Sequence, residues 1–213
     1  MEDTAFWDGN IAEALFLVFS NVALVPAIFL LAVKGDAISA YLLIFTLASS
    51  CLYHMCRAGA LCLFEYKNHR LLDYIAVYLS LTWILTRLAT QGNFRLHVFA
   101  FVVSFSLALF AAVSGINFGW LSVIGVGLPS VIALTHALIA HKPVFYHTGW
   151  AIATFVLSIV GGALIFFFPR TNYGWAHALW HVFIMLSVYT FILSTTPVVV
   201  TAAKRERQQI IKT

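Results

Sequence analysis

Charged residues are scarce in this chain of 213 residues, of which only 9% are Asp, Glu, Lys or Arg. Hydrophobic residues make up 62% of the sequence. A water-soluble globular protein carries about 25% charged residues, so the composition excludes that class. Cysteine is also scarce, with three residues and none after Cys62. We therefore expect a polytopic membrane protein without an appended soluble domain.

Apolar stretches of about 20 residues recur along the chain, which is the length that an α-helix needs to cross a bilayer core. Each stretch is predicted to be helical, because lipid offers the backbone no hydrogen bonds and the stretches are too long for barrel strands. The predicted fold is therefore all-α, with residues 1–213 forming a single seven-helix transmembrane domain that ends in a basic cytoplasmic tail at 201–213. The seven spans are predicted at about 11–33, 38–57, 72–91, 95–114, 118–140, 149–168 and 176–200.

The distribution of Lys and Arg predicts the orientation, because cytoplasmic loops carry an excess of these residues. With the N-terminus outside and the C-terminus inside, eight basic residues lie on the cytoplasmic side and four lie outside. The inner set is Lys34, Arg87, Arg95, Lys142, Lys204, Arg205, Arg207 and Lys212, and the outer set is Arg57, Lys67, Arg70 and Arg170. We therefore predict an outside N-terminus and a cytoplasmic C-terminus.

The formal net charge of +4 raises the question of a nucleic-acid partner. The basic residues cluster mainly in the tail segment Lys204-Arg205-Glu206-Arg207. Juxtamembrane basic residues determine topology and meet anionic lipid headgroups. We expect membrane lipids as partners and no nucleic acid.

Ionisable residues at the ends of the apolar stretches are the candidate functional residues, since such groups are costly in lipid. His54 ends the second span four residues after Ser50, Asp73 opens the third, and His177 and His181 open the seventh. The predicted topology puts all five residues at one depth, near the outer leaflet. Residues four apart share a helix face, so the three imidazoles can converge.

Three neutral imidazoles and a water molecule form a catalytic zinc arrangement in which the metal activates the water and polarises a carbonyl. In such a site Asp73 would act as the base or hold the water, and Ser50 would donate a hydrogen bond to the water or to a substrate oxygen. The alternative is that the histidine pair arises by chance and bonds only to nearby backbone carbonyls. The common depth of all five residues favours a shared metal site.

The pattern Ser50-x-x-x-His54, Asp73 and His177-x-x-x-His181 resembles the CREST superfamily, which contains alkaline ceramidases and the progestin and adipoQ receptors. The runs Cys-Leu-Tyr-His-Met-Cys at 51–56 and Leu-Leu-Asp-Tyr-Ile-Ala-Val-Tyr at 71–78 are most similar to its myomaker branch. The resemblance implies a seven-helix fold with a zinc site. It also implies a multi-pass protein of the plasma membrane, and also of the Golgi, that promotes fusion of muscle precursor cells at the lipid-mixing step.

Two functions from different classes follow from these observations. The chain is either a membrane-fusion factor whose zinc ion joins helices two, three and seven, or an intramembrane zinc-dependent lipid amide or ester hydrolase of the alkaline ceramidase type. Whether it is an enzyme is left open at this point. A fusion factor would also suit a homodimer and a fusion partner protein. The two readings differ in cavity shape, because a hydrolase needs a lipid-sized tunnel that reaches the metal, whereas a structural site is closed.

The remaining histidines and cysteines have several open readings. Cys56 and Cys62 face the oxidising side in the predicted topology, so a disulfide between them is permitted. Cys51 reads as a small buried apolar residue. His136 in the fifth span either lines a cavity or makes an interhelical hydrogen bond.

Overall fold

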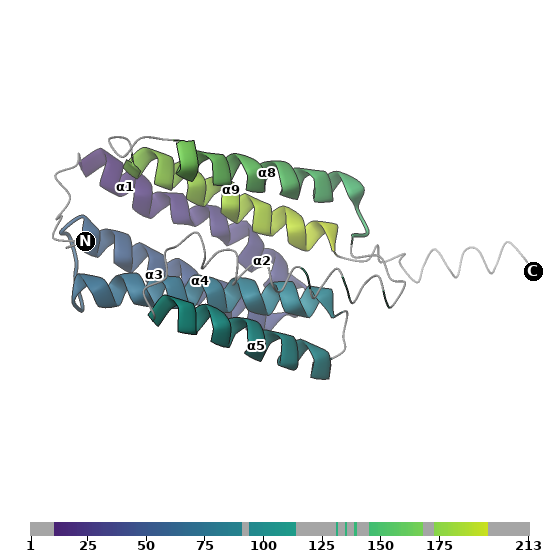
Figure 1. The fold of residues 1–213 in the computed structure, drawn as a ribbon. Coiled ribbons are helices and arrows are strands. Elements are labelled where there is room, and N and C mark those ends of the chain that lie inside the picture. Colours follow the sequence, from purple (N-terminus) through teal and green to yellow (C-terminus); the bar gives the residue numbers. More distant parts are fainter. Residues whose placement is uncertain are drawn as a thin grey trace, which may run out of the picture.

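The computed structural model describes residues 11–90, 94–113, 145–167 and 173–195, together with the single helical positions 131, 135 and 139. Throughout these residues the regular structure is helical and no strand occurs, which confirms the predicted all-α class. The helices lie side by side along one long axis (Figure 1). They are α1 (Ile11–Ser20), the 3-10 turn η1 (Asn21–Leu24), α2 (Val25–Val33), α3 (Ala37–Arg57), α4 (Tyr66–Ala89), α5 (Phe94–Val113), α8 (Thr148–Phe167) and α9 (Tyr173–Ser194).

Three described helices are long and apolar enough to cross a membrane, which makes this a membrane protein by length and composition. They are Ala12–Val33, which joins α1, η1 and α2 into one continuous helical segment, Ala37–Arg57 of α3 and Gly174–Ser194 of α9. Their mean hydropathies are 2.5, 1.4 and 1.7. They overlap the predicted first, second and seventh spans. The apolar stretches Phe94–Leu107 of α5 and Thr148–Leu164 of α8 are shorter and overlap the predicted fourth and sixth spans. The predicted fifth span, 118–140, and the tail at 201–213 lie outside the described residues, apart from positions 131, 135 and 139.

Two helices begin before the apolar stretch that was predicted as a membrane span within them. α4 begins at Tyr66 rather than at residue 72, and α9 begins at Tyr173 rather than at 176. The first residues of α4 include Lys67, Asn68 and Arg70, which are too polar to count as part of an apolar span. They are nevertheless helical. A helix can extend beyond its apolar stretch because polar side chains at its end remain solvated.

Glycines and a capping aspartate mark the polar breaks before and after α3. Gly35 and Gly59 adopt positive φ angles of 73° and 72° just after α2 and α3, the conformation in which glycine commonly terminates helices. Asp36 caps α3, because its carboxylate accepts hydrogen bonds from the Ser39 backbone N–H at 3.2 Å and from the Ser39 hydroxyl at 2.8 Å. The same carboxylate lies 2.6 Å from the Arg87 guanidinium of α4. These contacts join the ends of α2, α3 and α4 that lie away from His54.

Helix α9 packs against α8 on one side and against α1, η1 and α2 on another. Polar pairs link α8 to α9, with Ser158 2.7 Å from Ser187 and Thr154 2.9 Å from Thr190. Gly161 lets the two helices approach closely, since a Cβ there would lie 2.9 Å from Ile184 Cδ1. Small residues at helix contacts are the usual device for close packing in membranes.

Helices α3 and α9 are arranged differently. α3 packs on α1, α2 and α4, and within the described residues its backbone makes no close approach to that of α9. Side chains and a cavity fill the space between the two helices. Any direct connection between α3 and α9 therefore depends on long side chains, among which the candidate histidines stand out.

Candidate metal centre

The three predicted histidines meet in the interior of the bundle. His54 of α3 and His181 of α9 expose only 1% and 4% of their surface, and His177 of α9 is half-buried. One ring nitrogen from each lies within 4.8 Å of the other two, and the Nε2 atoms of His177 and His181 are 3.1 Å apart. The convergence predicted from the i, i+4 spacing and the common depth is thus present. The group could hold a metal ion.

His54 supplies the strongest observation in favour of a metal. Both of its ring nitrogens are buried, and neither has a hydrogen-bond partner within the described part of the chain. A buried polar group without a partner costs about 1–3 kcal/mol. In a neutral imidazole one nitrogen carries a proton that needs an acceptor, and the other carries a lone pair that needs a donor or a metal ion. The rings of His177 and His181 lie 5.2 and 4.9 Å from that of His54, centre to centre. A cation among the three would satisfy the His54 lone pair.

Ser20, at the end of α1, is a site residue that sequence reasoning missed. Its hydroxyl donates to the Leu17 carbonyl at 2.7 Å and lies 3.0 Å from Nδ1 of His181. A serine hydroxyl has one proton, so with that proton on Leu17 the hydroxyl oxygen accepts from His181 Nδ1–H. This geometry assigns the Nδ1–H tautomer to His181 and leaves the Nε2 lone pair directed at the other histidines, as a metal ligand requires.

A signal for Ser20 does exist in the sequence. Ser20 and Asn21 are adjacent polar residues in the middle of an apolar stretch, and both are almost fully buried, at 5% and 0% exposure. Polar residues inside a membrane segment mark functional or packing sites. Nothing in the spacing, however, connects this pair to a histidine that follows 161 residues later.

Helix α1 also supports the beginning of α9, next to the histidines. The Glu13 carboxylate accepts a hydrogen bond from the Trp175 backbone N–H at 3.1 Å, and the Phe16 and Trp175 rings lie 4.9 Å apart. A carboxylate near a helix N-terminus satisfies an otherwise unpaired N–H and complements the helix dipole. The first helix thus holds α9 both at its first turn and, through Ser20, at His181.

Ser50 and Asp73 form a buried pair on α3 and α4. They expose 2% and 7% of their surface, and the Ser50 hydroxyl hydrogen-bonds to the Asp73 carboxyl group. The second oxygen, Oδ1, has no partner within the described residues. Both side chains line the cavity that His177 and His181 also line. All five predicted residues therefore belong to one region, in which Asp73 has an oxygen available to a further ligand.

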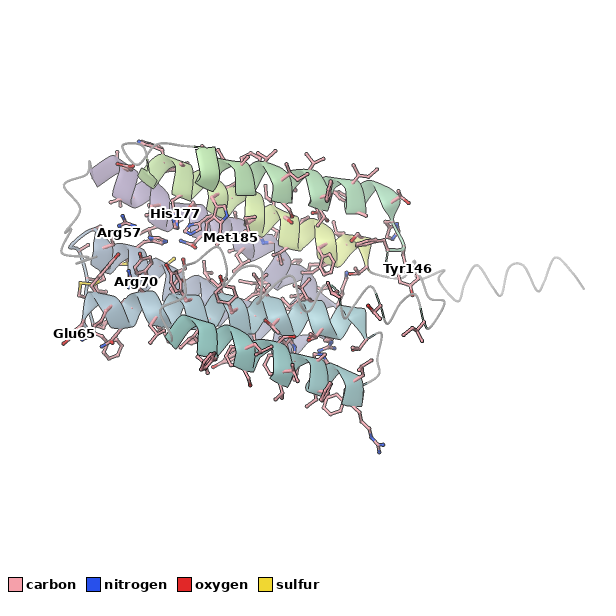
Figure 2. All side chains as sticks on the ribbon, viewed as in Figure 1. Arg57, Glu65, Arg70, Tyr146, His177 and Met185 are labelled. Carbon is pink, nitrogen blue, oxygen red and sulfur yellow. A yellow bond between two sulfur atoms is a disulfide. The ribbon has the colours of Figure 1, made fainter. Side chains whose placement is uncertain are left out.

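The cavity has a volume of about 260 Å³ and is polar at one end. Its histidine end carries Ser50, Asp73, His177 and His181, and its deeper part is lined mainly by apolar residues that include Leu24, Leu43, Met185 and Val188. Figure 2 shows His177 near one end of the bundle and Met185 nearer its middle. Such a space, apolar with a few convergent polar groups, is typical of small-molecule sites.

The loop that connects α3 to α4 closes the same end of the bundle. Cys56 and Cys62 form a disulfide, which resolves the alternative that the sequence left open. Nε2 of His69 accepts hydrogen bonds from the backbone N–H groups of Leu63 and Phe64, both at 3.1 Å. Cys51 is a free, half-buried thiol, and His136 lies outside the described residues. The disulfide and His69 thus anchor the loop from both sides.

Comparison with known proteins places the chain in a family defined by sequence. The family described as "Protein of unknown function (DUF3522)" matches residues 9–182, a region that includes Ser20, Ser50, His54, Asp73, and the His177–His181 pair. No curated protein matches the sequence significantly. Since the matched region covers most of the sequence, the chain belongs to the DUF3522 family.

Proposed function

We propose that this protein is an intramembrane, zinc-dependent hydrolase that cleaves a lipid ester or amide. The observation that carries the proposal is the cavity, because its apolar part leads to a polar end that contains two histidines of the cluster and the Ser50–Asp73 pair. A closed structural metal site would need neither an adjacent cavity nor a buried carboxylate with a vacant oxygen. The apolar residues that line the deeper part of the cavity support a lipid substrate.

Zinc is the proposed metal because the ligand set consists of three imidazoles. Neutral histidines suit Zn²⁺, and three of them leave a coordination position for catalysis. When bound, zinc supplies an activated water molecule and polarises the substrate carbonyl. The Ser20 contact with His181 agrees with this assignment, since histidine ligands usually donate their second N–H to an oxygen acceptor.

Asp73 is the proposed general base and acid. Its free oxygen Oδ1 takes a proton from the attacking water, and Ser50 holds the carboxylate in position through its hydrogen bond. As the carbon–oxygen or carbon–nitrogen bond of the substrate breaks, Asp73 returns the proton to the leaving oxygen or nitrogen. The products are a fatty acid and an alcohol or amine, and no other reactant is required.

The test compares Asp73→Asn with a control variant, Asp36→Asn. Asp36 caps the end of α3 that lies away from His54. Detergent-purified protein should contain one zinc ion per chain, and both variants should retain it. Asp73→Asn should lose release of fatty acid from lipid esters and amides, whereas Asp36→Asn should keep it. Each of His54→Ala, His177→Ala and His181→Ala should lose the metal as well. Stable protein without zinc, or an Asp73→Asn variant with full activity, would refute the proposal.

The same proposal includes seven spans, with the N-terminus outside and the C-terminus in the cytoplasm of a plasma-membrane protein. Two observations support this orientation: the excess of Lys and Arg on the predicted inner side, and the Cys56–Cys62 disulfide at the predicted outer end of α3. In a Cys51→Ser background, a membrane-impermeant thiol reagent should label Ala60→Cys but not Lys34→Cys in intact cells. The reverse pattern would place the histidines at the cytoplasmic leaflet.

A second candidate, the myomaker-type fusion factor, is favoured by one different observation. The histidines lie on α3 and α9, whose backbones do not approach each other, so zinc would join the two helices and add to folding free energy. In a cell-fusion assay this role predicts loss with His54→Ala and full fusion with Asp73→Asn. Fusion lost with Asp73→Asn at normal zinc content would favour hydrolysis instead. A homodimer and a fusion partner protein belong to this candidate.

A further inference from the structure

Two arginines lie at the histidine end of the bundle, about one helical turn beyond His54 and Asp73. Arg57 follows His54 by three residues on α3, and Arg70 precedes Asp73 by three residues on α4. At 1.5 Å per residue, each arginine lies about 4.5 Å nearer the end of its helix than its partner. Side chains three residues apart are neighbours on a helix surface, so Arg57 lies beside His54, and Arg70 beside Asp73.

The contacts of the site agree with this placement. Arg57 is within electrostatic range of both His54 and His177. Figure 2 shows Arg57, Arg70 and His177 at the same end of the bundle, far from Tyr146. Both arginines are half-buried, whereas Lys67, the other cation on this stretch, is exposed and pairs with Glu65 at 2.7 Å. The two arginines thus border the site and Lys67 lies outside it.

Four chemical layers therefore follow one another from the end of the bundle towards its middle. The arginines come first, then the histidines with Asp73, then Ser50 and the hydroxyl pair of Thr46 and Ser80, which are 2.6 Å apart. The deepest layer is the apolar part of the cavity. A glycerophospholipid has the same order of groups: a phosphate, then glycerol with its ester carbonyls, then acyl chains.

We propose that Arg57 and Arg70 bind the phosphate of a glycerophospholipid and thereby place one of its ester carbonyls at the metal centre. Guanidinium groups bind phosphate oxygens through paired, charge-assisted hydrogen bonds, which lysine does not reproduce. This inference rests on the proposed hydrolase and specifies its substrate class. Ceramide and diacylglycerol lack a phosphate, so both would leave the arginines without their ligand. The reaction converts a phospholipid and water into a lysophospholipid and a free fatty acid.

Competing substrates test this assignment directly. In mixed micelles the wild-type protein should hydrolyse phosphatidylcholine in preference to diacylglycerol with the same acyl chains and to ceramide. The Arg57→Gln/Arg70→Gln variant should raise KM for phosphatidylcholine about tenfold or more, as expected for loss of hydrogen bonds to a charged group. Its turnover of diacylglycerol should not change. Lys67→Gln is the matched control and should behave as wild type. Equal use of phosphatidylcholine and diacylglycerol by the wild type would overturn the inference.

A binding measurement separates this inference from the proposed hydrolase. Phosphatidylcholine and diacylglycerol are titrated against zinc-loaded Asp73→Asn protein, with zinc content and thermal stability recorded for every arginine variant. Preferential binding of phosphatidylcholine that disappears in the double variant supports the phosphate site. This result would stand even if the protein hydrolysed no lipid and the proposed hydrolase function were refuted. Displacement of the lipid by equimolar inorganic phosphate would assign the arginines to a free anion instead. Should the double variant unfold, Arg57→Lys and Arg70→Lys must each show the weakened binding, and wild-type affinity in both would refute the inference.

Discussion

In the proposed zinc site, removal of the Ser20 hydroxyl should weaken metal binding, although Ser20 is not one of the three proposed histidine ligands. In wild-type protein the hydroxyl accepts from His181 Nδ1–H and donates to the Leu17 carbonyl. Without it, the His181 ring keeps its contacts with the Leu17 backbone and with His177 but loses one acceptor for Nδ1–H, so its orientation is held less firmly. Nε2 of His181 is then directed at the proposed metal position in only a fraction of the molecules. Metal binding must fix the ring orientation, which lowers the net binding free energy.

The expected size of the effect follows from the role of Ser20. Loss of a hydrogen-bond partner that orients a metal-ligating histidine weakens metal binding by about 10–100-fold, or about 1.4–2.7 kcal/mol. Ser20→Ala also removes a hydrogen bond within α1. Ser49→Ala is a matched control for that loss, because Ser49 is likewise buried and donates to a carbonyl three residues earlier, that of Thr46, at 3.1 Å. Within the described part of the chain, Ser49 makes no hydrogen bond to a histidine.

Competition with a chelator of known affinity, on detergent-purified protein, measures the zinc Kd of the three proteins. Ser20→Ala should bind zinc about 10–100-fold more weakly than wild type, and Ser49→Ala should bind like wild type. Both should lose a similar amount of thermal stability in the apo form, since each lacks one helix hydrogen bond. Equal zinc affinity of Ser20→Ala and wild type would refute the tautomer assignment for His181, as would an equal loss in Ser49→Ala.

Other predictions concern packing and capping. Gly161→Ala should be about 1–3 kcal/mol less stable than Gly162→Ala, because a Cβ at Gly161 would lie 2.9 Å from Ile184 Cδ1, whereas a Cβ at Gly162 would meet nothing within 4 Å. Both variants gain the same helix propensity, so Gly162→Ala is the matched control. Equal melting temperatures of the two variants would contradict the close contact between α8 and α9. Asp36→Ala should cost about 1–2 kcal/mol, since it removes both the cap of α3 and the ion pair with Arg87. Arg87→Gln should cost less than about 1 kcal/mol, because its side chain is 42% exposed and the cap survives; an equal loss of stability in a thermal melt would show that Asp36 does not act as a cap.

The two candidate functions assign different tasks to the same metal. A hydrolase needs the ion to face the cavity, and a fusion factor needs it to hold α3 and α9 at a fixed separation. Both tasks require His54, but only hydrolysis requires Asp73. The carboxylate is therefore the residue that separates the candidates, and its buried, partly unsatisfied state is the feature that hydrolysis explains and a structural metal leaves unexplained.

The sequence alone was sufficient to predict the class of the protein and the members of the histidine cluster. Apolar stretches long enough to span a bilayer must be helical, since lipid does not hydrogen-bond with the backbone, and the described residues are helical. Spacing of four residues aligned His177 with His181, and the position at the end of a span put His54 at the same depth. These are properties of single helices, which local sequence determines.

Tertiary structure decided everything that depends on which helices are neighbours. Ser20 could be connected to His181 only by the packing of α1 on α9, across 161 positions. The cavity exists because the α3 and α9 backbones stand apart, and no pattern within either helix encodes that separation. The polar beginning of α4 lies outside the predicted span for a related reason, because hydropathy records where a helix is apolar and not where its hydrogen bonds end. A sequence thus specifies the faces of its helices, whereas the site is made where faces of distant helices come together in space.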